Sequence, residues 1–456
     1  MRNIISGIKA ISMVMALIFV IAIISSCNQT NKIENSAKAD KEMEWHKDAT
    51  IYEVNIRQYT EEGTFKAFQE HLPRLKSLGV DILWLMPIHP IGEKNRKGEM
   101  GSYYSVKDYK DVNPNFGTKE DFQALVDAVH EQGMYLILDW VANHSSWDNH
   151  LIEEHPEWYT RDSTGQMVSP YDWSDVADLD YSNDELRDYM SGALKYWVEE
   201  FNIDGYRCDV AGMVPVDFWE RAVADMNEVK PVFMLAEDEA ELELLDSAFH
   251  MHYGWEFHHK MNAVAQGKET VEDFYTYFDK IQGQMDSDDI KMNFLTNHDE
   301  NSWNGTINER MGEAQKAMAV VAWTVPGMPL IYTGQEMGID KRLEFFKKDV
   351  VEWKDSPLED FYTSLNELKA DNEALFAGEF GGSFNILKSD IPSDTFVFER
   401  KKDDNEVLVV TNLTPVEKSF TVEEATGTYL NHFTGKKVEL DGTFELPAWG
   451  YRVFVK

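Results

Sequence analysis

From residue 45 onward, short apolar runs alternate with segments whose apolar residues recur at helical spacing. This alternation is typical of βαβ units and a parallel sheet. Eight apolar runs have the composition of strands, and eight strands of this kind predict an α/β fold that closes into a (β/α)8 TIM barrel. The eight runs are ATIYEVNI, VDILWLMPI, YLILDWVANH, IDGYRCDVA, VFMLAEDE, SAFHMHY, KMNFLTNHD and MPLIYTGQE.

Two of the predicted helices have clear boundaries. Residues 65–79 carry an apolar stripe and end at a glycine, so the spacing predicts one continuous helix. Thr118 is expected to cap a second helix, which ends at Gly133. The apolar faces of these two helices consist of Phe65, Phe68, Leu72, Leu75 and Leu78, and of Phe122, Leu125, Val126 and Val129.

Two stretches depart from the alternation. Residues 144–181, after the third strand, are irregular and rich in aromatic residues, aspartate and proline, and they predict a small inserted domain. From residue 376 to 456, short strands and turns replace the helices, which predicts a C-terminal antiparallel β-sandwich. The catalytic barrel is therefore expected to span residues 45–375.

The N-terminal segment has the pattern of an export signal. Positive residues precede an apolar stretch that is too short for a membrane span, and the stretch closes at Ile24-Ser25-Ser26-Cys27. These four residues resemble a bacterial lipobox, so we expect residues 1–27 to be a lipoprotein signal and Cys27 to be acylated. The polar residues 28–44 read as a flexible tether. The alternative is an ordinary cleaved signal with an incidental cysteine.

Charge narrows the range of partners. The 456 residues include 43 Lys and Arg against 81 Asp and Glu, a net charge of -38, which argues against nucleic acid and against docking on anionic membranes. A lipid anchor is thus the only membrane attachment we expect, on an exported protein of the periplasm or the cell surface. The second cysteine, Cys208, lies in a strand and is predicted to be a core residue, so an acylated Cys27 leaves no disulfide.

Charged side chains cluster where the predicted strands end. Strand ends of a barrel converge on one face, so these groups are expected to act together. Cleavage of a glycosidic bond with retention needs one carboxylic acid and one carboxylate nucleophile. Arg207 stands two residues before Asp209, on the same side of a strand, and would keep Asp209 ionised. Glu237 follows the apolar run VFMLA, which suits a raised pKa and an acid role.

With these motifs the sequence resembles the α-amylase family of glycoside hydrolases from Trp45 onward. The segments DWVANH, DGYRCD, LAED and TNHD resemble four signature regions of that family, and they occur in the same order. The resemblance implies that Asp209 is the nucleophile, Glu237 the acid/base and Asp299 the stabiliser of the transition state.

The same resemblance suggests substrate and metal contacts. Tyr104, in MGSYYSVKDY, would stack on the sugar in subsite −1, and His144 and His298 would bind its hydroxyls. Asp139 would support Arg207 and the strand ends. The chemistry requires no cofactor, whereas calcium is possible near two residues of the third strand and the insertion, namely Asn143 and Asp178.

These features predict a retaining hydrolase of α-1,4-glucosidic bonds in starch-derived glucans or malto-oligosaccharides. Val210 follows the nucleophile, and Gly212 and Met213 stand where many amylases carry Lys-His. An α-1,6-acting glucosidase or a transglycosylase therefore stays open, as does, from another class, a catalytically silent glycan-binding protein. The oligomeric state is not indicated.

The insertion carries aromatic residues for which two roles compete. They could serve as platforms for sugar rings beside the cleft, or they could form the small domain's own core. These residues are Trp147, Trp158, Tyr159, Tyr171 and Trp173.

Overall fold

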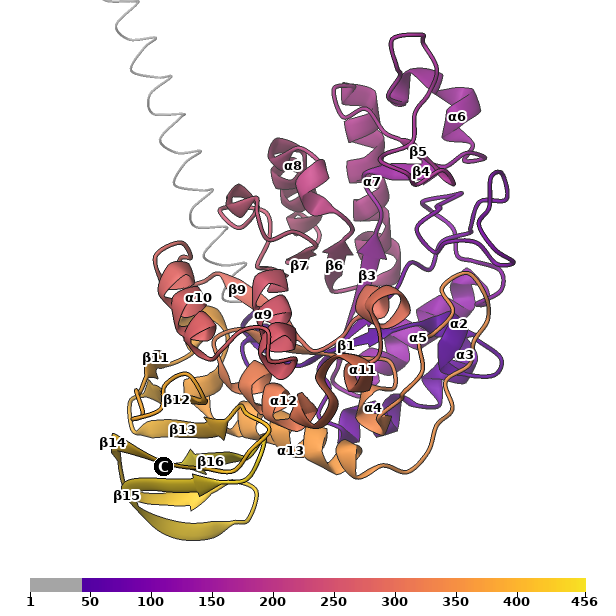
Figure 1. Cartoon of the computed structure of the whole chain (residues 1–456). Helices are drawn as coiled ribbons and strands as arrows, with labels where there is room; N and C mark the ends of the chain where they lie inside the picture. Colours follow the sequence, from indigo (N-terminus) through magenta and orange to yellow (C-terminus); the bar gives the residue numbers. More distant parts are fainter. Residues whose placement is uncertain (1–42) are drawn as a thin grey trace, which may run out of the picture. The chain divides into compact units, whose positions relative to one another are not determined.

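Eight parallel strands close into a barrel in the computed structural model, which describes residues 43–456 (Figure 1). In space the strands follow the closed order β1-β10-β9-β8-β7-β6-β3-β2. Most of them are buried along their whole length, as expected of barrel strands covered by helices. The strands are β1 (Ile51–Val54), β2 (Ile82–Leu85), β3 (Tyr135–Trp140), β6 (Gly205–Cys208), β7 (Phe233–Ala236), β8 (Met251–Tyr253), β9 (Ile290–Phe294) and β10 (Met328–Tyr332).

Helices surround the barrel and confirm the predicted (β/α)8 architecture. The predicted cap at Thr118 is also confirmed, because its side chain accepts from the backbone N–H of Asp121 and the carboxylate of Asp121 accepts in return. The helices are α2 (Ile56–Tyr59), α3 (Phe65–Gln69), α4 (Leu72–Ser77), α5 (Lys119–Glu131), α7 (Asp184–Phe201), α8 (Val216–Asn227), α9 (Trp255–Ala265), α10 (Glu272–Gln282), α11 (Ile307–Met311), α12 (Gln315–Thr324) and α13 (Pro357–Asp371).

The helix predicted over residues 65–79 is wrong in one respect. The chain forms two short helices, α3 and α4, instead of one. Pro73 lies in the first turn of α4, where its missing N–H costs nothing, whereas inside a continuous helix it would remove a hydrogen bond. The apolar stripe is nevertheless buried as expected, from Phe65 to Leu78.

The insertion after β3 forms the small element that the sequence predicts. Two short antiparallel strands, β4 (His144–Ser146) and β5 (Val176–Asp178), pair with each other. Between them lie a helical turn, α6 (Leu151–Glu154), and a 3-10 turn, η2 (Pro156–Trp158). In Figure 1 this element stands above the end of β3, beside α7.

The C-terminal module is antiparallel, as predicted, and its strands form one continuous sheet in the order β11-β12-β13-β16-β14-β15. Two of the short apolar runs in this stretch, SFTVEE and most of GTYLNHF, are joined into the single long strand β14, which carries a bulge. The sheet comprises β11 (Ser383–Ile386), β12 (Thr395–Lys402), β13 (Asn405–Asn412), β14 (Lys418–Asn431), β15 (Lys436–Leu446) and β16 (Tyr451–Val455).

Alternating residues of this sheet face two different cores. Phe396 and Phe398 of β12 join the core of the barrel, and the ring of Phe396 lies 5.4 Å from that of Phe274 in α10. Val397, between them, joins a separate cluster that includes Phe420 of β14. Successive side chains of a strand point to opposite faces of the sheet. One face of this sheet therefore packs against the barrel, and the other face packs within the module's own core.

The predicted signal, the acylated Cys27 and most of the tether fall outside the described residues. Within residues 43–456, no helix has the length and apolar composition needed to cross a membrane. Cys208 is a fully buried free thiol, as predicted.

Candidate active site

A cavity of about 530 Å³ opens where the barrel strands end, and the three predicted acids all line it. Asp209 directly follows β6, Glu237 directly follows β7, and Asp299 lies in the segment after β9. The fold thus brings three carboxyl groups that are far apart in the chain to one face of the barrel.

Arg207 joins the carboxylates of the site. Its Nη1 lies 2.8 Å from Oδ1 of Asp139 and 3.1 Å from Oδ1 of Asp209. Its Nη2 lies 2.8 Å from Oε2 of Glu237. The sequence predicts the contacts with Asp139 and Asp209, whereas the contact with Glu237 is an addition. One fully buried guanidinium therefore forms ion pairs with three carboxyl groups.

Two carboxyl groups of this cluster, Asp209 and Glu237, have raised pKa values. Burial, and then the charge of Glu237, raises the pKa of Asp209 well above its usual range, although Arg207 opposes the shift. Burial also raises the pKa of Glu237, again against Arg207. Burial and mutual repulsion thus favour the protonated forms of these carboxyl groups, whereas the charge of Arg207 favours their ionised forms.

A strained backbone residue fixes the position of Glu237. Val210 has φ +39°, a left-handed conformation that is unfavourable for a β-branched side chain and costs about 1–3 kcal/mol. In this conformation its N–H donates to Oε2 of Glu237 at 2.8 Å. This hydrogen bond holds the carboxyl group of Glu237 close to Asp209, the residue that precedes Val210.

Aromatic side chains enclose the guanidinium of Arg207. Its Cζ lies 5.0 Å from the ring centroid of Trp84 and 5.7 Å from that of Tyr253. Its Nε donates to the hydroxyl of Tyr253 at 3.2 Å. Trp84 and Tyr253 were not predicted as site residues, because a lone aromatic residue in a strand looks like any core residue.

His298 is held by charged partners on both ring nitrogens. Its Nδ1 lies 2.5 Å from Oε1 of Glu53, and its Nε2 lies 3.3 Å from Oδ2 of Asp299. Burial disfavours the imidazolium, but the charges of Asp299 and Glu53 outweigh it and raise the pKa of His298 to about 9. Glu53 was missed, although a single glutamate inside the apolar run of β1 was a usable signal.

Tyr104 lines the cavity, and its stacking on a sugar stays a prediction. Its ring stacks on that of His298 at 5.4 Å and 22°, and its hydroxyl donates to Oδ2 of Asp139 at 3.1 Å. These contacts fix the ring's orientation in the cavity.

His144 also lines the cavity, with its Nε2 4.0 Å from Oδ2 of Asp209. Burial lowers its pKa to about 3. It is therefore neutral at physiological pH, in contrast to His298, and can offer one hydrogen bond to a ligand.

Aromatic residues form opposite parts of the cavity lining. Of the five in the insertion, Trp173 lines the cavity, whereas Trp158 and Tyr159 are buried in the small domain and fit the core role. Tyr171 and Trp147 do not line it. The cavity is also lined by three aromatic residues that were not predicted, namely Trp303, Phe345 and Phe346.

The residues proposed for calcium contact each other. Nδ2 of Asn143 donates to Oδ1 of Asp178 at 3.4 Å, so the two side chains form a hydrogen bond between the third strand's end and β5. Calcium requires six to eight oxygens, and this pair alone does not supply them. Calcium at Asn143 and Asp178 stays a prediction, and no chemical step depends on it.

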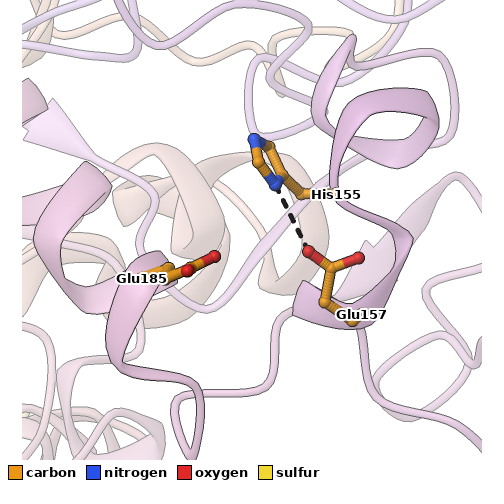
Figure 2. Close-up of side chains that lie close together, drawn as sticks. All are labelled: His155, Glu157 and Glu185. Carbon is orange, nitrogen blue, oxygen red and sulfur yellow. Dashed lines mark hydrogen bonds and ion pairs between the residues drawn. The ribbon is translucent and has the colours of Figure 1, made fainter.

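Another cluster of ionisable groups lies in and near the insertion, away from the cavity. Figure 2 shows His155 bonded to Glu157, with Glu185 of α7 facing them; their nearest ligand atoms lie within 4.8 Å of one another. Stacking of the His155 ring on Trp158 at 3.9 Å gives this histidine a packing role. The cluster is solvent-exposed for the most part, and such acidic groups are common without a metal.

Comparisons with known proteins agree with this geometry. A family model described as "Alpha amylase, catalytic domain" matches residues 30–173 and 152–374. "Alpha-amylase MalA" of Haloarcula japonica is 27% identical over 382 residues, which cover 80% of this chain and 55% of MalA. The chain thus spans only about half the length of that relative.

Two solved structures are similar over most of the chain. An α-amylase from Lactobacillus plantarum has a TM-score of 0.82 and 32% identity, covering 90% of this chain and 99% of that one. The "noncanonic maltogenic alpha-amylase AmyB" of Thermotoga neapolitana has a TM-score of 0.83 and 29% identity, covering 90% and 98%.

Proposed function

The chain belongs to the α-amylase family of glycoside hydrolases, and from this premise we propose that it cleaves α-1,4-glucosidic bonds in starch-derived glucans or malto-oligosaccharides with retention of configuration. One observation carries the proposal: Arg207 contacts both Asp209 and Glu237 in a cavity that Asp299 also lines. Retention requires an acid and a nucleophile close together, at about 5–5.5 Å.

In the first step Glu237, as the carboxylic acid, gives its proton to the glycosidic oxygen. The carboxylate of Asp209 attacks the anomeric carbon, the bond from that carbon to the oxygen breaks, and the leaving sugar departs as an alcohol. Burial of Glu237, which raises its pKa, supports its role as the proton donor. Burial raises the pKa of Asp209 as well, and the contact with Arg207, which opposes this shift, supports its ionised form as the nucleophile.

In the second step water attacks the anomeric carbon of the glycosyl ester on Asp209. The carboxylate of Glu237 takes a proton from this water, and the ester bond breaks to restore Asp209. The product keeps the α configuration because two inversions occur at the same carbon. No cofactor enters either step.

The remaining side chains would bind the sugar whose bond is cleaved. Tyr104 offers an aromatic face, which suits the apolar C–H face of a sugar ring. His144, which is neutral, and His298, which is charged, would bind hydroxyl groups. Asp299 would stabilise the positive charge that develops on the ring in the transition state.

The α-glucan substrate is supported by the names of the relatives. MalA and the protein from Lactobacillus plantarum are called α-amylases, and AmyB is called maltogenic. The strongly negative chain also suits a neutral substrate better than an anionic one.

The residues that follow the nucleophile support a second candidate specificity, α-1,6 cleavage or transfer to a sugar. Val210 follows the nucleophile, and Gly212 and Met213 replace the Lys-His of many amylases. These differences lie beside Glu237, where the leaving sugar would bind, and they favour α-1,6 cleavage or transfer to a sugar as the alternative to α-1,4 hydrolysis.

Product analysis on amylose, maltotriose, pullulan and isomaltose tests the proposal. We expect hydrolysis of amylose and maltotriose, with α-anomers as the first products in NMR spectra. Cleavage of isomaltose alone, or β-anomers as first products, would contradict it. Hydrolysis that is equally fast in Asp209→Asn would show that another residue is the nucleophile. No hydrolysis of any of these substrates by the wild type would favour the catalytically silent glycan-binding protein.

We also propose that the protein is exported and anchored to a membrane by lipid on Cys27. The support is the lipobox-like sequence that ends at this residue. Mass spectrometry of the mature N-terminal peptide tests this: a diacylglyceryl mass on Cys27 is expected, and an unmodified cysteine or cleavage elsewhere would contradict it.

A further inference from the structure

We propose that two loops close the cleft on the side opposite Glu237, so that the enzyme attacks α-glucan chains from their non-reducing ends and not at internal bonds. The loops are residues 91–106, after β2, and residues 340–350, after β10, and together we call them the glycone wall. This inference rests on the proposed function, because it assigns Glu237 the role of proton donor to the leaving sugar.

The order of strands around the barrel puts the glycone wall on the side opposite Glu237. Glu237 follows β7, which lies four strands away from β1 in either direction around the closed barrel. The strands β2 and β10 are the two neighbours of β1, so the loops that follow them stand across the barrel from the acid. Since the acid faces the leaving sugar, the wall faces the non-reducing part of the substrate, the glycone.

The two loops of the wall are tied to each other. The N–H of Met100 donates to the carbonyl of Phe346 at 2.9 Å. The buried Arg57 of α2 donates to the carbonyls of Gly101 at 3.1 Å and of Phe345 at 3.2 Å. The guanidinium of Arg57 thus forms hydrogen bonds with both loops of the wall.

Close backbone packing leaves no passage between the loops at Gly98. This residue has φ +63°, and a Cβ added there would lie 2.5 Å from Cβ of Phe346. Any side chain at this position would force the loops apart, so glycine allows them to touch.

The first loop is also tied to the insertion. Nζ of Lys97 lies 2.9 Å from Oδ1 of the buried Asp175. The N–H of Glu93 donates to both carboxylate oxygens of Asp148, at 3.0 and 3.1 Å. Lys97, Asp175 and Phe346 all line the cavity, so this barrier faces the substrate.

On the side of Glu237, opposite the glycone wall, fewer side chains cover the cleft. Gly212 and Met213, which follow β6 on the side of Glu237, are exposed, and the first has no side chain. A long chain can leave the cavity past these residues but not past the wall. The cavity's volume, about 530 Å³, is within the range of pockets for small ligands, which fits a short glycone.

A pair of substrates tests the proposal on the whole enzyme. One is p-nitrophenyl α-maltoheptaoside, and the other is the same compound with an ethylidene acetal on its non-reducing end. Chromatography of the first products gives kcat/KM for each. We expect the blocked compound to react at least about tenfold more slowly, because the added group meets the wall.

Equal rates on the two compounds would overturn the glycone wall and leave the proposed function intact, since an enzyme that cuts internal bonds ignores the end. No cleavage of either compound would overturn the proposed function itself. The two failures are therefore distinguishable.

A variant pair locates the barrier. Lys97→Ala removes the bridge to Asp175, and we expect it to raise the rate on the blocked compound, relative to the open one, severalfold. Lys107→Ala is the matched control, because Lys107 directly follows the first loop and pairs with Glu93 of that loop and with Asp148 of the insertion but does not line the cavity. An unchanged ratio in Lys97→Ala, with a normal melting temperature, would show that this bridge is not the barrier.

Discussion

Oε1 of Glu53 lies 2.5 Å from Nδ1 of His298, and both side chains are buried at the centre of the barrel's active face. The carboxylate favours the charged imidazolium, whose Nε2 lies 2.8 Å from the hydroxyl of Tyr104 and 3.3 Å from Oδ2 of Asp299. Glu53 touches no predicted substrate position, so it is a positioning residue that acts through His298.

Glu53→Gln is expected to lower kcat/KM about tenfold or more, because a hydrogen bond to a charged partner is worth about 1.5–3 kcal/mol. The change also moves the pKa of His298 from about 9 toward its usual value. The alkaline limit of the pH–rate profile should therefore shift to lower pH, which a purely structural role would not cause.

Glu336→Gln is the matched control for this variant. Glu336 is equally buried and pairs with Arg74, but it does not line the cavity. We expect it to lower stability and leave the pH profile in place. A profile that shifts in both variants, or in neither, would contradict the role of Glu53.

The same pair predicts how stability depends on pH. The pKa of His298 is raised above its usual 6.5 in the folded state, so the pair contributes fully below about pH 6.5 and its contribution is lost as pH rises through about 9. The melting temperature of the wild type should approach that of Glu53→Gln between these values. Curves that stay parallel from pH 6 to 10 would count against a charged His298.

Glu237→Gln is expected to separate proton donation from nucleophilic attack. The amide keeps an acceptor for the N–H of Val210 but has no proton to give. Loss of a general acid costs about 10²–10⁴-fold, so maltotriose should react that much more slowly. α-Maltosyl fluoride, whose leaving group needs little protonation, should lose far less in the first step. Equal losses in the first step on both substrates would contradict the acid role.

Trp303 is expected to serve as a platform for a sugar ring at the cavity's mouth. Its ring is 53% exposed, lines the cavity and lies 5.4 Å from that of Phe345. Trp303→Ala should raise KM about tenfold, equivalent to ~1.4 kcal/mol, with kcat little changed.

Tyr171→Ala is the control for the platform. Tyr171 is more exposed, at 77%, but does not line the cavity. Its KM for maltoheptaose should stay at the wild-type value. A platform at Trp303 would be refuted by the same KM in both variants.

Much of the fold was predictable because periodicity reports burial directly. The eight strands, the insertion and the cap at Thr118 all follow from local pattern. The break between α3 and α4 was overlooked because the apolar stripe continues through Pro73. Joining of two C-terminal strands into β14 depends on a bulge, which alternation does not reveal.

The site was predictable only where polar residues interrupt apolar strands at their ends. That signal found Asp209 and Glu237, whereas Asp299 and Tyr104 followed from the resemblance to the α-amylase family. It did not find Trp303 or Phe345, because aromatic residues in loops have no distinctive pattern. Their role depends on which loops meet across the barrel, and this is a property of the closed sheet rather than of any segment.

The covalent intermediate gives the most direct test of the central claim, that Asp209 attacks the sugar while Glu237 supplies and takes the proton. Glu237→Gln, treated with α-maltosyl fluoride and digested, should show a glycosyl adduct on the peptide that contains Asp209, because the adduct forms but is hydrolysed slowly. The double variant with Asp209→Asn should show none. An adduct on another residue, or β-configured products with no adduct, would contradict the account.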